Sequence, residues 1–217
     1  MRYYPIALKI TGRDCVVVGG GEVAERKVRS LLAAGAQVTV VAPQATQGLR
    51  QLAATGRIQL LQREVAAGDL MGAAVVIVAT DDPQRNLRVC RQARAQGALV
   101  NVVDDPAHCD FIAPAVVQRS SVTIAVSTGG KSPALAAEIR RRIELTIGDE
   151  YGALADLLGE MRGRVRTAIP DAARRTAFWH SLAQMDLLLD LLRQSDEQAA
   201  RQRAESILAA WQEPVYE

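Results

Sequence analysis

The chain has 217 residues, of which 49% are hydrophobic and 23% are charged, and its formal net charge is +2. A chain of this length and composition buries a sizeable core, which excludes an intrinsically disordered protein. A charge of +2 is too small to indicate nucleic acid as the main partner. We therefore expect a globular protein with one large domain or a domain with an appended module.

Three cysteines, Cys15, Cys90 and Cys109, are widely spaced along the chain. An odd number at these spacings forms neither a disulfide framework nor a CxxC metal clip and suits a reducing compartment. The first residues, MRYYPIALKITGRD, lack the apolar core of a signal peptide, and the longest apolar run is far short of a membrane span. We expect a soluble, cytoplasmic protein with no targeting segment and no membrane contact.

From Asp14 to about Val103, short β-branched runs alternate with helical patterns. The strand candidates are CVVVGG, QVTVVA, RIQLLQ, AVVIVATD and ALVNVVDD. This alternation predicts βαβ units and therefore an α/β domain with a parallel sheet. Between the first two runs, Ala24, Val28 and Leu31 recur at helical spacing, and Gly35 marks the end of that helix.

After Asp105 the pattern changes to a loop, one or two strands, a Gly-rich turn and a helix that carries Leu135, Ile139 and Ile143 on one face. Pro133 suits the first turn of that helix. Beyond Gly148 only helical patterns remain. We expect three parts: residues 1–113 as a nucleotide-binding domain, 114–147 as a small α+β segment, and 148–217 as an all-helical module.

The stretch VVVGGGEVAERK contains Gly19-x-Gly21-x-x-Ala24, which fits the G-x-G-x-x-G/A fingerprint of dinucleotide-binding domains. The glycines allow a tight turn and a close approach of the backbone to pyrophosphate at a helix N-terminus. An apolar strand before the motif and an amphipathic helix after it strengthen the interpretation. The alternative is a glycine-rich turn used only for packing.

The fingerprint has an acidic residue about 20 positions further on, where it binds the ribose hydroxyls. No Asp or Glu occurs between Glu25 and Glu64, and the second strand ends at Val41-Ala42-Pro43-Gln44. Backbone groups and the Gln44 side chain would have to contact the ribose instead. No arginine at this strand end favours a 2′-phosphate, so the residues leave the choice between NAD and NADP open.

A second glycine loop, Ala125 to Ser132, matches a relaxed P-loop with alanine in place of the first glycine. Pro133 disfavours helical geometry at Ser132, which makes Ser132 a better N-cap than a first-turn residue. No apolar strand ending in Asp follows to help hold magnesium. Both points argue against nucleotide hydrolysis.

Two strand ends carry paired acids, Asp81-Asp82 and Asp104-Asp105. The carboxyl ends of parallel strands form the edge where open α/β sheets bind ligands, so one of these carboxylates is a candidate general base. Capping of a helix is the alternative role, and it suits Asp81 or Asp82 before PQRNLRVC. Asp104 is the better candidate, because the DPAHCDF that follows does not start a helix.

Asp104, His108, Cys109 and Asp110 lie within seven positions, but their spacing matches no standard structural zinc site, and we expect no permanent metal. His180, beside two aromatic residues, is given no role. Arginines that pair with carboxylates are numerous between Arg140 and Arg175. Acidic residues are interspersed among them, so a mixed-charge solvated surface is the better interpretation for most of them.

The ordered motifs YPIALKITGRDCVVVGGGEVAERKVRSLLAAGAQVTVVAP, ATDD, NVVDDP and DFIAPAVVQRSSVTIAVSTGGKSPALA, followed by an Arg-rich helical tail, resemble the precorrin-2 dehydrogenase / sirohydrochlorin ferrochelatase family. This family includes the N-terminal module of siroheme synthase. The similarity covers nearly the whole chain and is strongest through residue 145. No methyltransferase domain follows, so the chain looks like the stand-alone form.

The resemblance implies a Rossmann domain, a dimerisation segment near residues 114–147, a helical tail and a homodimer. It implies NAD-dependent oxidation of precorrin-2, an acidic tetrapyrrole, to sirohydrochlorin, and some members also insert ferrous iron as a substrate. The family's key acid falls on Asp104. The implied cofactor contacts are Gly19, Gly21, Glu22, Val23, Pro43, Gln44, Thr80 and Asp81, and Ser127, Thr128 and Gly129 are expected to line the substrate site.

A non-catalytic NAD-sensing regulatory module is the competing hypothesis. The acid in NVVDDP and the long helical tail argue against it, because a minimal sensing module needs neither. Nothing in the residues separates a dehydrogenase from an enzyme that also chelates iron, and we favour the dehydrogenase alone.

Overall fold

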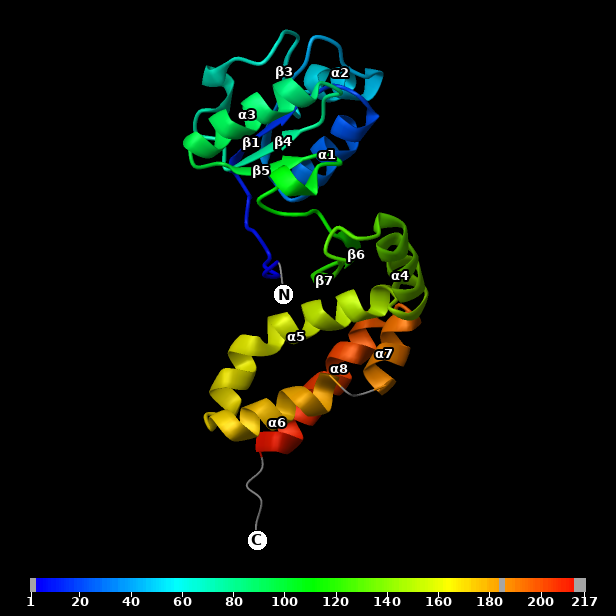
Figure 1. Cartoon of the computed structure of the whole chain (residues 1–217). Helices are drawn as coiled ribbons and strands as arrows, with labels where there is room; N and C mark the ends of the chain where they lie inside the picture. Colours follow the sequence, from blue (N-terminus) through cyan, green and yellow to red (C-terminus); the bar gives the residue numbers. More distant parts are fainter. Residues whose placement is uncertain (1–2, 184–185, 213–217) are drawn as a thin grey trace. The chain divides into compact units, whose positions relative to one another are not determined.

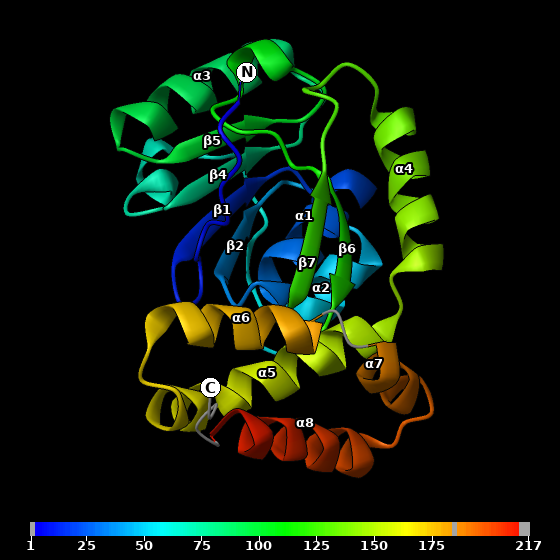
Figure 2. The same cartoon turned by 90° about the horizontal axis from the view of Figure 1, so that it is seen from below.

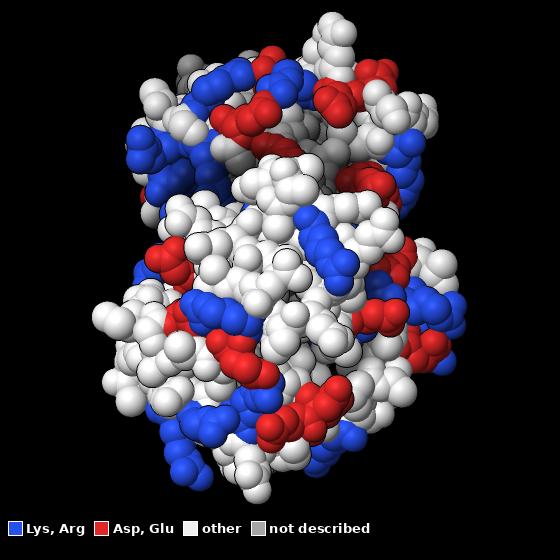
Figure 3. Space-filling view, turned by 90° about the horizontal axis from the view of Figure 1, so that it is seen from above, with Lys and Arg blue, Asp and Glu red and all other residues white. Residues whose placement is uncertain are grey.

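The computed structural model describes residues 3–183 and 186–212. The chain divides into two compact units, Met1–Ala113 and Pro114–Glu217, and each is described here by itself (Figure 1). Among the described residues, no helix combines the length and the apolar character needed to cross a membrane. Basic and acidic side chains are interspersed on the face drawn in Figure 3.

The first unit is built on a five-stranded parallel sheet with the order β3-β2-β1-β4-β5. This is the order of the first five strands of a Rossmann fold, 3-2-1-4-5, and it confirms the predicted fold class. The central strands are apolar and buried on both faces, as parallel sheets covered by helices require. The strands are β1 (Asp14–Val18), β2 (Gln37–Val41), β3 (Gln59–Leu61), β4 (Val75–Val78) and β5 (Leu99–Val102).

Helices cover both faces of this sheet (Figure 2). On one face, Ala24, Val28 and Leu49 pack against alternate strand residues such as Val17 and Val40. On the other face, helix α3 and a 3₁₀ turn pack against the residues in between. The elements are α1 (Glu22–Ala33), α2 (Gln47–Ala54), η1 (Ala67–Leu70), α3 (Pro83–Ala95) and η2 (Pro106–His108).

The sequence DPAHCDF does start a short helical turn, η2, so the expectation that no helix begins there is wrong. Residues 106–108 form one turn of 3₁₀ helix, with Asp105 at its N-cap position. Pro106 favours this start because its ring fixes a helical φ and its missing N–H has no partner to lose. Asp104 precedes the cap, so it remains outside the helical turn.

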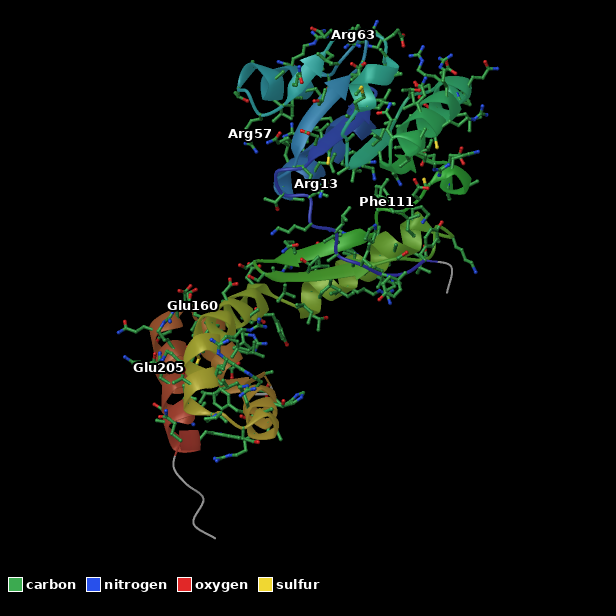
Figure 4. The ribbon with its side chains drawn as sticks, turned by 90° about the vertical axis from the view of Figure 1, so that its left-hand side faces the viewer. Arg13, Arg57, Arg63, Phe111, Glu160 and Glu205 are labelled. Atoms are coloured by element: carbon green, nitrogen blue, oxygen red, sulfur yellow. The ribbon has the colours of Figure 1, made fainter. Side chains whose placement is uncertain are left out.

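The second unit begins with an antiparallel ribbon of β6 (Ala115–Arg119) and β7 (Val122–Val126), followed by α4 (Pro133–Thr146). Four further helices then pack around a core that includes Met161, Phe178 and Leu188. They are α5 (Asp149–Ala168), α6 (Ala172–Ala183), α7 (Asp186–Arg193) and α8 (Glu197–Gln212). Ion pairs from Arg164 to Glu205 and from Arg201 to Glu160 link α5 to α8, and both acids are labelled in Figure 4.

The predicted apolar face of α4 is present, and much of it is exposed. Leu135 is 51% exposed and Ile139 is 36% exposed. Helix α4 begins as expected, with Pro133 in its first turn and the Ser132 hydroxyl accepting a hydrogen bond from the Leu135 N–H at 3.2 Å.

Candidate functional site

The glycine turn lies at the carboxyl end of β1, where the sheet order reverses between β1 and β4. Gly19 has a φ of +124°, and a Cβ atom at this position would stand 2.1 Å from the Ala79 carbonyl oxygen. Both the backbone conformation and the lack of space therefore require glycine here. Gly19 allows the chain after β1 to lie close to the end of β4, at the carboxyl edge of the sheet.

Gly20 lies between the two glycines of the sequence fingerprint, and packing requires a glycine at this position as well. A Cβ atom on Gly20 would stand 1.9 Å from the Gln44 carbonyl oxygen and 3.0 Å from the Ala42 Cβ. The Gly20 carbonyl also accepts a hydrogen bond from the Thr46 N–H at 2.9 Å. The glycine turn is thus joined to the loop that follows β2, which carries Pro43 and Gln44.

Gly21 occupies the N-cap of α1 and differs from its two neighbours, since a Cβ there would meet no atom within 4 Å. The first N–H groups of a helix have no partner within the helix, and the helix dipole favours negative charge at this end. The backbone of Gly21 and Glu22 is exposed and therefore accessible to an anion. This arrangement fits the pyrophosphate of a dinucleotide.

Glu25 links α1 to the start of α2. Its carboxylate accepts a hydrogen bond from the Thr46 hydroxyl at 2.5 Å and pairs with Arg29 at 2.6 Å. These two contacts, with Thr46 the larger, lower the pKa of Glu25. The carboxylate also fills the space beside Gly48, where a Cβ atom would stand 2.1 Å from it. Glu25 is therefore occupied in bracing the loop and is not available as the missing ribose ligand.

At the end of β2, Pro43 and Gln44 are exposed, as expected for residues that contact a ligand from the loop. At the end of β4, the Thr80 hydroxyl lies 2.5 Å from Oδ1 of Asn86, and Asn86 donates to the Thr80 carbonyl at 2.9 Å. Asn86 thus fixes the loop after β4. Asp81 in this loop is exposed.

Asp82 caps α3 by accepting a hydrogen bond from the Arg85 N–H at 3.0 Å, which confirms the capping interpretation for this acid. Asp105 binds His108 Nδ1 at 2.6 Å, and Asp110 pairs with Arg94 at 2.8 Å. These three carboxylates therefore have structural partners. In the described part of the chain, no three His, Cys, Asp or Glu side chains are grouped closely enough to hold a metal ion.

Asp104 differs from these acids. It is exposed, and its φ of +59° places it in the left-handed region that non-glycine residues seldom adopt. Among the described residues, its carboxylate has no hydrogen bond or ion pair, and its interaction with Lys27 acts over a longer distance. A carboxylate that is free and held in an uncommon conformation at a ligand-binding edge is available to accept a proton.

Cys109 fixes the turn that contains Asp104. Its Sγ accepts a hydrogen bond from the Val102 N–H at 3.2 Å and lies 3.2 Å from the carbonyl oxygens of both Val102 and Asp105. Burial raises the pKa of this thiol, which favours the neutral form that can donate. The thiol therefore ties the end of β5 to the residue that follows Asp104.

The second glycine loop lacks the geometry of a P-loop. It follows β7, which pairs with β6 in a two-stranded antiparallel ribbon, and Lys131 precedes the helix. The Ser127 hydroxyl accepts from the Gly129 N–H at 3.1 Å, while the Thr128 hydroxyl bonds to both the N–H and the carbonyl of Ser132 at 3.0 Å. These contacts close the loop on itself.

Comparison with known proteins matches three family models along the chain. Residues 6–115 match the model described as "Putative NAD(P)-binding", which covers half of the chain. The chain belongs to this NAD(P)-binding family. Residues 119–145 match the "Sirohaem biosynthesis protein central" model, and residues 150–208 match the "Sirohaem synthase dimerisation region".

Several siroheme synthases are similar to this member of the NAD(P)-binding family. The protein from Pseudomonas paraeruginosa is 46% identical over 187 residues, which are 86% of this chain and 40% of the relative. The protein from Methylococcus capsulatus is 49% identical over 179 residues, covering 82% of this chain and 38% of the relative. The chain thus spans about two fifths of the length of these relatives.

A solved structure, "SirC, precorrin-2 dehydrogenase", is similar over nearly all of this NAD(P)-binding chain. Its TM-score is 0.74 at 26% sequence identity, and the match covers 94% of this chain and 100% of that one. The dimerisation model matches residues 150–208, and the central model matches residues 119–145, which lie within the expected dimerisation segment 114–147. The bounds of the three parts stay a prediction.

In this NAD(P)-binding domain, the structure brings several predicted residues to one edge of the sheet. Gly19, Gly21, Pro43, Thr80 and Asp104 all lie at or just after the carboxyl ends of parallel strands or at the adjoining helix start. Ser127, Thr128 and Gly129 belong to the second unit, and their role stays a prediction.

Sequence reasoning missed residues that support the predicted ones. Gly20 is the middle one of three consecutive glycines, which is a visible pattern in the sequence. The fingerprint nevertheless specifies only the first and the third glycine, so it predicts no role for Gly20. Asn86 and Cys109 gave no local signal, because their partners lie at other strand ends. Four of the arginines between Arg140 and Arg175 pair with acids, which agrees with the mixed-charge interpretation: Arg140, Arg141, Arg142 and Arg164. Arg174 and Arg175 instead donate to backbone carbonyls.

Proposed function

We propose that this chain oxidises precorrin-2 to sirohydrochlorin with NAD as the hydride acceptor. The structural match to the precorrin-2 dehydrogenase extends over the whole of that protein, which supports the activity, and the siroheme synthase relatives support the same biosynthesis. The observation that carries the chemical assignment is the free carboxylate of Asp104 at the edge where the glycine turn opens.

The first unit fits a dinucleotide because Gly21 leaves the start of α1 open while Gly19 and Gly20 close the turn behind it. The bound nicotinamide would accept a hydride from the substrate. We infer that the backbone at Gly19, Gly21, Glu22 and Val23 binds the pyrophosphate, and that the loops after β2 and β4 bind the remainder. The contacts proposed there are Pro43, Gln44, Thr80 and Asp81. We propose NAD rather than NADP, since neither an arginine nor a lysine stands among Val41, Ala42, Pro43 and Gln44 to bind a 2′-phosphate.

Asp104 acts as the base in this proposal. The oxidation removes one hydride and one proton from the macrocycle, and Asp104 accepts the proton. Its exposed carboxylate needs no partner to be released first, whereas Asp82, Asp105 and Asp110 would each lose a structural contact. Ser127, Thr128 and Gly129 are proposed to line the substrate site.

We further propose that two copies of the chain form a homodimer. Each chain then has three parts, residues 1–113, 114–147 and 148–217. The dimerisation model supports this assembly, and so does the exposed apolar face of α4, which a second chain would cover. A cytoplasmic location is proposed because the three cysteines are free. Iron insertion is not part of the proposed activity.

The test compares wild type with Asp104→Asn. Asparagine tolerates the left-handed conformation and keeps the size of the side chain but cannot act as the base. We expect the rate of NADH formation from precorrin-2 to fall about 10²- to 10⁴-fold, with NADH affinity unchanged. Normal turnover in the variant would remove Asp104 from the mechanism.

Two further outcomes concern the function itself. Wild-type protein that binds NADH tightly but never oxidises precorrin-2 would favour the sensing module over the enzyme. Supplying sirohydrochlorin and ferrous iron to the same two proteins tests metal insertion, and siroheme formed by wild type would show that the enzyme is bifunctional.

A further inference from the structure

Lys27 lies on the side of α1 that faces away from Glu25. Successive residues of a helix are about 100° apart, so two positions separated by two residues lie on nearly opposite sides. The buried stripe of α1, formed by Ala24, Val28 and Leu31, runs between them. Glu25 is turned toward the loop before α2, where it binds Thr46. Lys27 therefore points away from β2 and toward the other half of the sheet.

That direction leads to the loop that carries Asp104. The apolar cluster containing Ala24 and Val28 also contacts Val103 and Phe111, which flank the loop from 104 to 110. Phe111 is labelled in Figure 4. Helix α1 thus packs beside this loop, and Lys27 is close enough to Asp104 for their charges to interact.

The charge of Lys27 is not neutralised within the described residues. Its side chain is half-buried, yet no acid lies within ion-pair distance and no hydrogen bond engages its ammonium group. Burial lowers the pKa of Lys27, neighbouring Arg26 lowers it further, and Asp104 and Cys109 oppose both effects. A partly desolvated cation without a partner gains free energy when an anionic group binds beside it.

We propose that Lys27 binds a carboxylate of the substrate and so orients the macrocycle against Asp104. This inference rests on the proposed function, since it takes the acidic tetrapyrrole as the ligand. Lys27 follows the pyrophosphate-binding start of α1 by about 7 Å along the helix axis, and its side chain leans back toward that start. Lys27 therefore lies between the start of α1, where we place the cofactor, and the loop that carries Asp104. A substrate that contacts both the cofactor and Asp104 would bring its carboxylates near this position.

The alternative is a lysine whose stem covers apolar surface while its ammonium group stays in water, which requires no ligand. Lys27→Met separates the two, because methionine keeps an unbranched stem and removes the charge. Lys9→Met is the matched control, since Lys9 is exposed and lies in the segment before β1. The measurements are KM and kcat for precorrin-2, the Kd of NADH and the melting temperature.

We expect Lys27→Met to raise KM for precorrin-2 about 10- to 100-fold, as loss of a charged hydrogen bond does. The Kd of NADH and the melting temperature stay near wild type, Lys27→Arg recovers most of the loss, and Lys9→Met has no effect. An increased Kd for NADH would show that the anion is a cofactor phosphate and overturn the proposal. Unchanged KM and kcat would show that Lys27 only covers apolar surface.

Failure of the proposed function gives a different result. Wild type that neither oxidises precorrin-2 nor binds sirohydrochlorin in an absorbance titration would refute the activity and, with it, this role of Lys27. Active wild type with a fully active Lys27→Met variant refutes the role of Lys27 alone.

Discussion

Alanine substitutions at the adjacent residues Gly20 and Gly21 should affect different properties. Gly20→Ala should lower the stability of the fold, and Gly21→Ala should weaken NADH binding. At Gly21 the new methyl group meets no atom within 4 Å and the backbone is extended, with a φ of −80° and a ψ of −175°. The only loss in the free protein is the poorer N-cap, which costs less than about 1 kcal/mol. That methyl group nevertheless projects into the open position where we place the pyrophosphate.

At Gly20 the methyl group would stand 1.9 Å from the Gln44 carbonyl oxygen, which belongs to the backbone and cannot rotate away. Relief to an ordinary contact requires the loop after β2 to move by more than 1 Å, and it also strains the hydrogen bond from Thr46. Overpacking of this kind costs about 1–3 kcal/mol. Gly20→Ala should therefore lower the free energy of unfolding by that amount.

Thermal unfolding of the free protein and calorimetric titration with NADH distinguish the two effects. Gly21→Ala should unfold close to wild type and bind NADH about 10- to 100-fold more weakly, because the methyl group displaces the pyrophosphate from its charge-assisted contacts with the N–H groups at the helix start. A matched control needs a glycine where a methyl group meets no atom and the φ is not positive. Gly68 meets both conditions, whereas Gly56 has a positive φ. Wild-type NADH affinity in Gly21→Ala, with Gly68→Ala as the control, would refute the placement of the pyrophosphate.

Three further predictions follow from individual contacts. Cys109→Ala removes the thiol that ties Val102 to Asp105, so kcat for precorrin-2 should fall about 10-fold while the Kd of NADH is unchanged; an unchanged kcat would show that the thiol does not position Asp104. Glu25→Gln should lower the melting temperature at pH 7, and this loss should shrink as the pH falls below 4.5. The lowered pKa of Glu25 stabilises the fold above its ordinary value of 4.5, and the contribution is lost as the pH falls through the folded-state pKa. A loss that stays the same as the pH falls would contradict this cause. Ser132→Ala should destabilise the second unit by about 1 kcal/mol in urea unfolding, whereas a loss of nucleotide binding without a loss of stability would revive the P-loop interpretation.

The sequence predicts the fold of the first unit well because its signals are local. Short β-branched runs separated by helical patterns specify parallel strands, and the glycine fingerprint locates the first turn. Capping by Asp82 and Ser132 follows from the same local rules and is confirmed. The expected apolar face of α4 is also present, and its residues Leu135 and Ile139 are exposed.

The supporting contacts of the site depend on pairs that are distant in the sequence. Gly20 is constrained by Gln44, Glu25 by Thr46 and Gly48, and Cys109 by the end of β5. No periodicity marks such pairs before the strands are placed. The left-handed conformation of Asp104 is likewise invisible in the sequence, because aspartate occurs far more often in other conformations.

The glycines at positions 20 and 48 should accordingly differ in how they vary among relatives. The atom that limits Gly20 is a backbone carbonyl oxygen, which every amino acid at position 44 supplies, so no compensating replacement at 44 makes room for a side chain. The atoms that limit Gly48 belong to the Glu25 carboxylate. A relative with a shorter residue at position 25 can therefore accept alanine at 48. Position 20 should be nearly invariant, while positions 25 and 48 should covary.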